Sequence, residues 1–387
     1  MKYLVIGDSN SMHIYNFVKT VLLPRKYEVH LLTLSARPVR EEYMNFYKES
    51  GVYIHSIAAK GYKNLEKKDY IHRLLNILRK LQLMKEVPYV DVCHVHSVYK
   101  TALVMVLHNR RKFGKLILSY WGGDIEDRSD KVVKLREKCF QFADVITVTV
   151  KQTYNEFQEL YGTQYNSKLQ ICRFATDGLN YIHQLSKNLS REECRASYGI
   201  PKEKICITCG YSAYAAQHQD VCLEIIQNLD KDLRKKLYVI VPMQYGRYDA
   251  EYIQRVKDIA LQCDFPCIIL EEYVPFEMSA KLAISTDIYL HLRDTDAFSN
   301  ALKEQVYADS YVIKGDWLQY PELEEMRAGI TSISSFDDLQ EALRKAINGI
   351  GVSEHITLFD PIFKLYSTEE IRTQWSKVID AVLSKGI

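Results

Sequence analysis

The stretch "DIYLHLRDTDAFSNALKEQVYADSYVIKG", residues 287–315, predicts how this chain folds. An apolar strand pattern occupies 287–292, a polar turn follows, a helical pattern comes next, and a second apolar strand pattern occupies 310–315. Strands that alternate with helical patterns are typical of a parallel sheet whose two faces are covered by helices. This stretch therefore predicts one repeat of such a sheet.

The same rhythm runs along the rest of the chain. The first half has strand patterns at 2–7, 27–34, 52–57, 91–97, 115–120 and 144–149, and the second half at 204–210, 237–242, 266–273, 287–292 and 310–315. Residues 175–203 have no strong strand pattern and end in Gly-Ile-Pro. We therefore predict an α/β protein of two Rossmann-like domains in tandem, joined within 175–203.

Length and composition indicate a globular protein. The chain has 387 residues, of which 47% are hydrophobic and 26% charged, and that length suits two domains. A net charge of +2 gives no overall reason to expect nucleic acid. No apolar run approaches the roughly 20 residues of a membrane span, and the nine scattered cysteines suggest reduced thiols. We expect a cytoplasmic protein.

Two pairs of residues have spacings found in metal sites. Cys206 and Cys209 have zinc-knuckle spacing, but they lie in a strand-like run with no second pair at a suitable distance, which favours a core strand. His94 and His96 share one face of a strand and are either two ligands or the end of a strand that faces a cleft. We predict no metal site.

Ligands of parallel α/β sheets bind outside the carboxyl ends of the strands, where helix N-termini attract anions. With two domains, we expect the site in a cleft between them. In the first half, Gly7 ends a strand and Ser9 lies in the small polar turn that follows; close approach of a ligand and an ordinary capped turn are both open. After strand 115–120, Trp121, Gly122, Gly123 and Asp124 offer an aromatic wall and a carboxylate, or a glycine turn capped by Asp124.

Two turns of the second half could bind a diphosphate. "CGYSAYAAQHQD" (209–220) contains Ser212 and His218, and "PMQYGRYDAEYI" (242–253) contains Tyr245, Gly246 and Arg247. Both turns precede helical patterns, so amides, hydroxyls and cations could face an anion. Neither is a P-loop, and helix capping alone could explain each. A dinucleotide glycine fingerprint is absent from the sequence, which disfavours an oxidoreductase.

The turn within 287–315 gives the most specific prediction of a ligand site. Asp296 precedes Ala297, Phe298, Ser299 and Asn300, and Glu304 lies one turn into the helix that follows. Two carboxylates beside a helix N-terminus suit a polyhydroxylated ligand, because each carboxylate can accept two hydroxyl groups. The alternative is an exposed turn in which Glu304 supports the helix dipole.

Here the sequence resembles a known family. Asp296, seven residues and Glu304, with "AFSNALKEQVYA", are similar to the signature of retaining glycosyltransferase family 4, in which an acidic residue, a Gly-Phe-Gly turn and a helical Glu bind the donor sugar and ribose. "RFATDGLNYI" (173–182), "FADVITVTVKQTYNEF" (142–157) and "YWGGDI" (120–125) also resemble segments of that family. The resemblance implies the GT-B architecture, a nucleotide-diphosphate sugar as donor substrate, no cofactor and no obligatory metal.

The implied domains are an acceptor-binding domain over 1–176, a nucleotide-sugar-binding domain over 177–360, and helices over 361–387 that return to the first domain. The family places Arg and Lys after the first strand of the second domain, whereas this chain has Tyr211, Ser212, Gln217 and His218 there. That turn is similar instead to inverting bacterial 4-acetamido-4,6-dideoxygalactose transferases. Stereochemistry therefore stays open, and an inverting reaction needs a base, for which Asp124 and His13 are the candidates.

The resemblance implies a role for each group of residues. Asp296 and Glu304 join Asp124 and His13 as catalytic candidates. The substrate-binding candidates of the first half are Gly7, Ser9, Trp121, Gly122 and Gly123. Those of the second half are Ser212, His218, Tyr245, Gly246, Arg247, Tyr273, Val274, Arg293, Ala297, Phe298, Ser299 and Asn300. The backbone of Tyr273 and Val274 is expected to contact the base.

The expected reaction is a hexosyl transfer to a saccharide acceptor, lipid-linked, in bacterial polysaccharide or glycoconjugate synthesis. Residues 60–86 combine Lys and Arg with Leu and Ile at helical spacing, which indicates either a helix at the inner face of the plasma membrane or a solvated helix packed on its own domain. A nucleotide-sugar epimerase of the same fold and a non-catalytic nucleotide-sugar sensor are the alternatives.

Overall fold

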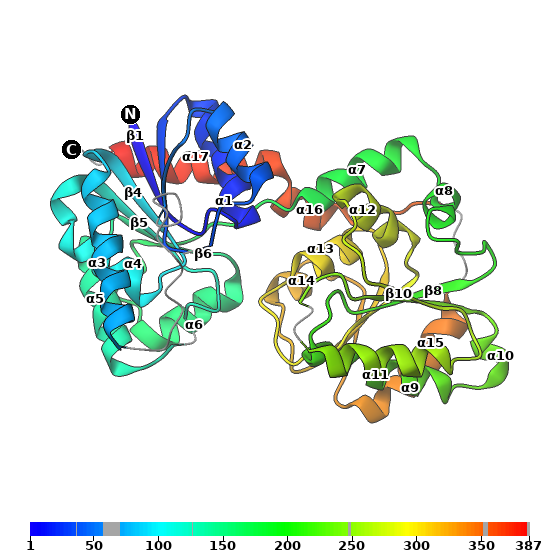
Figure 1. The fold of residues 1–387 in the computed structure, drawn as a ribbon. Coiled ribbons are helices and arrows are strands. Elements are labelled where there is room, and N and C mark those ends of the chain that lie inside the picture. The colour runs from blue at the N-terminus through cyan, green and yellow to red at the C-terminus, as the bar shows by residue number, and fades with distance from the viewer. Residues whose placement is uncertain (36, 57–69, 126, 247–248, 351–354, 385–387) are drawn as a thin grey trace. The chain divides into compact units, whose positions relative to one another are not determined.

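The computed structural model describes residues 1–387 except 36, 57–69, 126, 247–248, 351–354 and 385–387. The chain divides into two compact units, one formed by Met1–Ala175 with Thr368–Ile387 and the other by Thr176–Ser367. Each unit is an α/β body with its own sheet (Figure 1). The prediction of an α/β fold with two Rossmann-like sheets is therefore confirmed.

The described residues of the first unit form a seven-stranded parallel sheet in the order β3-β2-β1-β4-β5-β6-β7. Its strands are β1 (Lys2–Gly7), β2 (Glu28–Thr33), β3 (Tyr53–Ser56), β4 (Val90–His96), β5 (Phe113–Ser119), β6 (Val145–Val148) and β7 (Leu169–Ile171). Its helices are α1 (Met12–Phe17), α2 (Glu41–Glu49), α3 (Tyr70–Glu86), α4 (Lys100–His108), α5 (Asp130–Phe142), α6 (Lys151–Tyr161) and α17 (Thr368–Ser384).

Helices cover both faces of this sheet, which explains why its strands are apolar at nearly every position. One face packs against α3 to α6 through residues such as Met84 and Phe140. The other face packs against α1, α2 and α17 through Phe17, Tyr47 and Trp375. Trp375 is fully buried, and its indole N–H donates to the carbonyl of Arg173 at 2.9 Å. The last helix therefore completes the core of the first unit.

In its described residues, the second unit forms a six-stranded parallel sheet in the order β10-β9-β8-β11-β12-β13. Its strands are β8 (Ile205–Cys209), β9 (Leu237–Pro242), β10 (Cys267–Leu270), β11 (Ile288–His291), β12 (Tyr311–Gly315) and β13 (Ile330–Ile333). Its helices are α7 (Asp177–Asn188), α8 (Arg191–Ala196), α9 (Gln219–Gln227), α10 (Lys231–Arg234), α11 (Ala250–Leu261), α12 (Phe276–Ser285), α13 (Asn300–Tyr307), α14 (Pro321–Glu325), α15 (Leu339–Gly349) and α16 (Asp360–Tyr366).

Residues 287–315 contribute β11 and β12 to the middle of this second sheet. β11 pairs with β8 on one side and β12 on the other, both in parallel register. Within the unit, α9, α11 and α15 cover one face and α7, α12 and α13 the other (Figure 1). The strand order reverses direction between β8 and β11, which is the position at which open α/β sheets bind ligands.

The strand prediction missed two short edge strands. β7 has three residues and β13 has four, and both pair with a single neighbour. Their apolar patterns are too short to stand out from a loop. One predicted strand is too long. The strand expected over 266–273 ends at Leu270, so that Tyr273 and Val274 lie in a loop.

The domain limits also differ from the prediction. Thr176 groups with the second unit, not with the first, and so does α16, which was expected among the returning helices over 361–387. The reason is local packing, because Phe363 of α16 stacks on Tyr307 of α13 with centroids 5.1 Å apart and on His183 of α7 at 4.5 Å. Of the two helices described within 361–387, α17 belongs to the first unit and α16 to the second.

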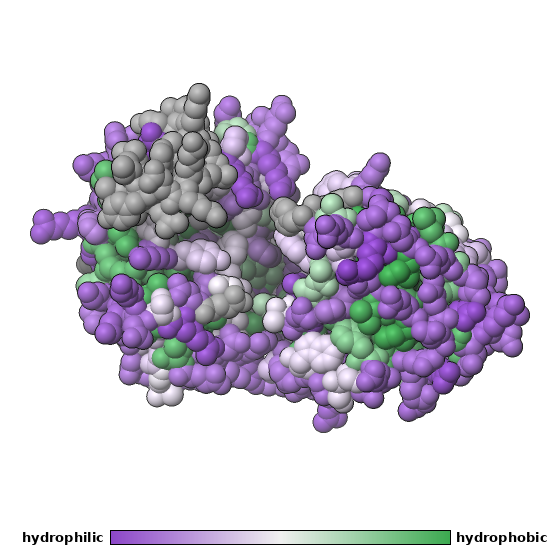
Figure 2. All heavy atoms as spheres, turned by 60° about the horizontal axis from the view of Figure 1, so that its bottom comes forward, coloured by the Kyte–Doolittle hydropathy of each residue, from purple (hydrophilic) through white to green (hydrophobic). Residues whose placement is uncertain are grey.

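No helix of the described residues is long and apolar enough to cross a membrane. Hydrophilic side chains dominate the face of the molecule in Figure 2, with hydrophobic residues scattered among them. Much of the expected interfacial helix, including Lys67 and Lys68, lies outside the described residues. At the end of α3, Leu83 and Met84 are buried in the first unit's core, so that this part of the helix packs on its own domain.

Candidate functional site

The turn before α13 is built around the side chain of Asp296. Its Oδ2 accepts the backbone N–H of Ser299 at 2.8 Å, and Ser299 caps the helix by accepting the N–H of Leu302 at 3.4 Å. Phe298 has a φ of 63°, a left-handed conformation that is unusual for an aromatic residue. It is held there by burial against Tyr320 and Tyr366, at 5.4 and 5.7 Å between ring centroids.

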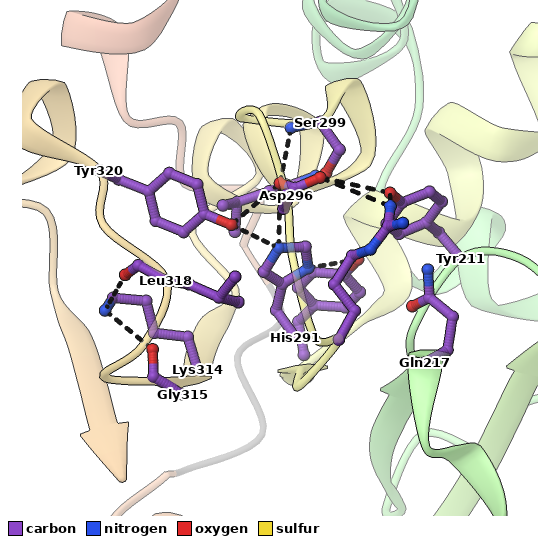
Figure 3. A network of polar contacts seen from close by, with 12 residues as sticks. Tyr211, Gln217, His291, Asp296, Ser299, Lys314, Gly315, Leu318 and Tyr320 are labelled. Carbon is purple, nitrogen blue, oxygen red and sulfur yellow. Dashed lines mark hydrogen bonds and ion pairs between the residues drawn. The ribbon is translucent and has the colours of Figure 1, made fainter. Parts of the chain in front are cut away.

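Asp296 is the centre of a polar network inside the second unit (Figure 3). Its Oδ2 also accepts the hydroxyl of Tyr320 at 2.9 Å and lies 3.2 Å from Nε2 of His291. Its Oδ1 accepts the hydroxyl of Tyr211 at 3.4 Å. The Asp296 side chain is only 4% exposed. Both oxygens are therefore engaged by protein groups.

The network defines which atoms carry protons. Burial opposes ionisation of Asp296, but the contacts with His291, Ser299 and Tyr320 outweigh it and hold the pKa of that carboxyl below its usual range. Because the Tyr320 hydroxyl donates to Asp296, its oxygen accepts from Nε2–H of His291, 2.8 Å away. A charged carboxylate with several fixed donors is a rigid element.

Arg293 is held beside this carboxylate. Its guanidinium donates to the Tyr211 hydroxyl, lies 3.6 Å from Oδ1 of Asp296 and stands 5.4 Å from the centre of the Tyr211 ring. Its backbone carbonyl accepts the indole N–H of Trp317 at 2.9 Å. The Arg293 side chain remains 22% exposed. It is therefore a preorganised cation just beyond the carboxyl end of β11.

Glu304 lies on the next turn of α13 and is partly buried. Its Oε1 accepts the hydroxyl of Thr176 at 3.3 Å. Burial raises the pKa of Glu304 to about 7, although the Thr176 hydroxyl and the charge of Lys303 lower it. Burial and then the charges of Tyr211, Asp296 and Glu304 raise the pKa of Tyr289 on β11, which places both carboxylates near one phenol.

The turn after β8 uses its predicted ligand groups internally. Ser212 is fully buried and its Oγ accepts the amide of Gln217 at 3.0 Å. His218 has a φ of 53° and its Nε2 lies 2.6 Å from Oδ1 of Asp294. The N–H of Gln219, the first residue of α9, donates to the hydroxyl of Tyr252. This turn therefore has fewer groups available to bind an anion than its sequence suggests.

The turn after β9 and the loop after β10 expose aromatic side chains. Tyr245 is 64% exposed and Tyr273 is 77% exposed. Gly246 has a φ of 77°, and a Cβ there would lie 2.4 Å from the ring of Tyr214, so that this turn requires glycine. Val274 is partly buried, and Arg247 lies outside the described residues.

In the first unit, Asp124 organises the turn after β5. Its Oδ1 accepts the N–H groups of Trp121 and Gly122 at 2.8 and 3.0 Å, and its Oδ2 accepts that of Val98 at 2.7 Å. The residue is 1% exposed. Burial raises its pKa, and the three amides oppose that shift. Asp124 is thus committed to holding the backbone, which argues against its predicted role as a base, and Gly123 faces open space.

His13 lies in an aromatic cluster next to this turn. Its ring centroid is 5.4 Å from that of Trp121 and 5.2 Å from that of Phe174. His96 is also in the cluster, 5.8 Å from Trp121, and is 2% exposed. Burial, aided by the charge of His13, lowers the pKa of His96 to about 3. His96 is therefore neutral at physiological pH.

Several buried polar atoms in and beside this cluster have no hydrogen-bond partner in the described part of the chain. Among the described residues, no hydrogen bond reaches either ring nitrogen of His96, the indole N–H of Trp121 or the hydroxyl of Ser9. Unpaired buried polar groups are rare and costly in native proteins. Gly7 has a packing role, since a Cβ there would lie 2.2 Å from Ile14 and 3.3 Å from Cβ of His96.

The structure thus places predicted residues after the carboxyl ends of strands in each unit. Gly7, Ser9, His13 and the 121–124 turn lie at the carboxyl ends of β1, β4 and β5, and the 293–304 segment at that of β11. Sequence reasoning missed His291, Tyr320, Thr176 and Gly178 as parts of the site. His291 could have been found, since it ends the strand before Asp296, but the others come from distant segments.

The two residue pairs with metal-site spacing are part of the packed interior. Cys206 and Cys209 are both fully buried in β8, which confirms the core-strand interpretation. His94 makes internal contacts with the hydroxyls of Tyr3 and Ser119. No group of three or more His, Cys, Asp or Glu side chains in the described ranges is placed to hold a metal ion.

Comparisons with known proteins bear on the fold. Residues 2–150 match the family described as glycosyl transferase 4-like, and no curated protein matches the chain. A glycosyltransferase from Rickettsia africae matches with TM-score 0.70 and 12% identity, covering 100% of both chains. HepE from Anabaena, solved with UDP and glucose, matches with TM-score 0.67 and 10% identity over 98% of this chain and 100% of that one.

Sucrose-phosphate synthase from Thermosynechococcus elongatus matches with TM-score 0.71 and 10% identity, again over 100% of both chains. At such identities the likeness concerns the fold. Two parallel sheets of seven and six strands, each covered by helices, agree with that likeness along nearly the whole chain. The chain therefore has the GT-B fold of these glycosyltransferases.

Proposed function

We propose that this protein is a glycosyltransferase that moves a sugar from a nucleotide-diphosphate donor to a saccharide acceptor, with the donor on its second unit. The observation that carries the proposal is the start of α13, where Arg293 and Glu304 flank the capped helix end at the switch point of the sheet. The match of residues 2–150 to a glycosyl transferase 4-like family supports it from the other unit. HepE, which shares the fold, was solved with UDP-glucose.

Glu304 is the proposed ribose ligand. Its carboxylate is held by Thr176 through one oxygen, and a carboxylate has acceptor sites to spare for the two hydroxyls of a ribose. The ionised form binds more tightly, because both of its oxygens are charged acceptors, whereas protonation turns one of them into a donor. The pKa of about 7 makes donor binding weaker as the pH falls below neutrality.

Arg293 is the proposed ligand of the diphosphate. The turn after β8 has no Arg or Lys, and His218 is turned to Asp294. Arg293 is the cation that the contacts with Asp296 and Tyr211 hold in place at this edge of the sheet. As the bond between the sugar and the diphosphate breaks, negative charge grows on the leaving phosphate, and a fixed guanidinium stabilises that charge.

Asp296 has a positioning role in this proposal. Its shorter side chain leaves it buried among His291, Tyr320 and the Ser299 amide, with both oxygens engaged. It fixes Arg293 and the first turn of α13. The Asp296 carboxylate is therefore not proposed to contact the sugar itself.

The first unit is proposed to bind the acceptor. The unpaired polar atoms of Ser9, His96 and Trp121 can meet hydroxyl groups. The acceptor hydroxyl attacks C1 of the donor sugar while the bond from C1 to the diphosphate oxygen breaks. In an inverting reaction His13 takes the acceptor proton, and in a retaining one the leaving diphosphate takes it.

Further features remain part of the proposal. These are the transfer of a hexosyl group without a metal, a lipid-linked acceptor at the inner face of the plasma membrane, and a role in bacterial polysaccharide or glycoconjugate synthesis. The Lys and Arg content of residues 60–86 motivates the membrane part. Vesicles of anionic phospholipid test it, since a variant with Lys67, Lys68, Arg73 and Arg79 neutralised is expected to lose binding, and unchanged binding would contradict the idea.

Calorimetric titration with UDP-glucose, UDP-galactose, GDP-mannose and their nucleotides tests the donor assignment. Wild-type protein is expected to bind one nucleotide family, and Glu304→Ala is expected to weaken that binding at least about tenfold, as for a lost charged hydrogen bond. Glu341→Ala, whose side chain is 59% exposed on α15, is the control. Equal affinity of the Glu304→Ala variant would contradict the assignment.

A further inference from the structure

Thr176 begins the second unit and contacts Glu304 directly. It is 1% exposed and caps α7, yet its side chain makes no capping hydrogen bond to that helix. A threonine at this position commonly accepts a backbone N–H of the first turn. Here the hydroxyl donates to Oε1 of Glu304 instead, at 3.3 Å.

Gly178, the second residue of α7, lies beneath the same carboxylate. A Cβ at this position would lie 1.9 Å from Oε1, 2.3 Å from Cδ and 2.9 Å from Cγ of Glu304. Glycine is otherwise unfavourable in a helix. Its presence lets the Glu304 side chain rest on the backbone of α7, where the N-terminal end of the helix dipole favours a negative charge.

Other contacts hold α7 in place against α13. Nδ1 of His183 on α7 lies 2.8 Å from the hydroxyl of Tyr307 on α13, and Phe363 of α16 stacks on both of these side chains. The two helices are thus joined within one turn of Glu304, at Tyr307. Packing therefore fixes the start of α7, on which the Glu304 carboxylate rests.

From this arrangement we infer that Thr176 and Gly178 are positioning residues that fix the Glu304 carboxylate for the ribose of the donor. The inference rests on the proposed function, and it assigns donor binding to a segment outside the β11–α13 turn. Thr176 orients one oxygen by a hydrogen bond. Gly178 supplies the space in which the side chain lies.

The surroundings of Glu304 predict a pH signature. Burial is the main cause of its raised pKa, Asp177 of α7 adds to it, and Thr176 and Lys303 oppose it. Tyr289 of β11 also interacts with Glu304, and its own pKa is raised far beyond this range. Removing the Thr176 hydroxyl should therefore raise the pH below which the donor binds weakly.

Three substitutions test the inference by titration with UDP and GDP. Thr176→Val removes the hydroxyl at nearly constant shape and is expected to weaken nucleotide binding about tenfold, whereas Thr176→Ser keeps the hydroxyl and is expected to restore it. Gly178→Ala displaces the Glu304 side chain from Cγ outward, so affinity is expected to fall, while the higher helix propensity of alanine offsets the cost to the melting temperature. Gly349→Ala, at the end of α15 with no atom within 4 Å of the added Cβ, is the matched control.

The pH profile separates positioning from a merely structural role. The midpoint of the affinity loss is expected near pH 7 in the wild type and in Thr176→Ser, and at higher pH in Thr176→Val. Glu304→Gln separates the proposed donor site from the proposed positioning roles of Thr176 and Gly178. If Glu304→Gln leaves binding unchanged, or if neither nucleotide binds, the donor site itself is wrong. If only Glu304→Gln weakens binding while Thr176→Val and Gly178→Ala match Gly349→Ala, the positioning inference alone is overturned.

Discussion

Nε2 of His291 lies 3.2 Å from Oδ2 of Asp296, and the two side chains are 0% and 4% exposed. The Asp296 carboxylate therefore bonds to other groups of the protein, although the sequence pattern places it in the position of a sugar ligand. Glu304, eight residues later, is the carboxylate with free acceptor capacity. The two acidic residues of the motif have different physical environments, and their variants should behave in opposite ways.

Asp296→Asn should destabilise the protein, because it removes a buried charge whose donors stay behind. Loss of one partner of a buried ionic network costs roughly 3 kcal/mol. Since the folded pKa of Asp296 is lowered, its contribution is present above the unfolded value near 3.8 and is lost as the pH falls through the folded pKa. Urea denaturation at pH 6 should show the loss. Asp294→Asn, whose side chain is 61% exposed, is the control, and equal stability of both variants would contradict the buried network.

Glu304→Gln should stabilise the protein at high pH. The folded pKa of Glu304 is raised to about 7, so the folded state holds a proton that the unfolded state releases near pH 4.5. Wild-type stability therefore falls as the pH rises from about 4.5 to 7, by at most roughly 3 kcal/mol. The variant lacks this loss. Thermal melts should separate the two proteins at pH 8 and bring them closer at pH 5; a constant difference would contradict the raised pKa.

Arg293→Ala should lose affinity for nucleoside diphosphates by about 10- to 100-fold, since a charged hydrogen bond to phosphate disappears. Arg293→Lys should recover only part of it, because an ammonium group lacks the planar fork that contacts Tyr211 and Asp296 together. Calorimetry with UDP and UMP measures the effect, and the preference for UDP should shrink. Arg255→Ala, with a side chain 58% exposed, serves for comparison. An unaltered preference in Arg293→Ala would assign the diphosphate to another residue.

His96→Phe should keep or raise stability and abolish transfer. Two buried ring nitrogens without partners among the described residues are unfavourable, and replacing them with carbon should gain about 1 kcal/mol. If those nitrogens bind the acceptor, the donor is still bound but product no longer forms. Melting temperature, nucleotide affinity and product formation are measured on the same preparation. A variant with normal transfer would show that His96 is only part of the core.

The sequence was most informative where local patterns were long. Alternating apolar runs predicted every central strand of both sheets, and the turn at 293–300 was placed before a helix that carries Glu304. The edge strands β7 and β13 were missed because three or four residues carry too little pattern. The extent of the second unit was misjudged because the stacking of Phe363 on Tyr307 depends on tertiary packing.

The roles of single side chains were harder to predict. A carboxylate in a glycine turn looks the same in sequence whether it faces solvent or binds three amides, as Asp124 does. Tyr320 reaches Asp296 from 24 residues away, and Thr176 reaches Glu304 from 128 residues away. Such contacts follow from strand order, which one sequence does not encode locally.

Hydrogen exchange followed by mass spectrometry, with and without a saturating nucleoside diphosphate, tests the central claim most directly. The proposed donor site predicts slower exchange in peptides that cover residues 293–304, and the expected contact of Tyr273 and Val274 with the base predicts the same for peptides that cover 273–274. Little change is expected in β1 and β4 of the first unit. Protection confined to the first unit, or none at millimolar UDP and GDP, would contradict a donor site at the start of α13.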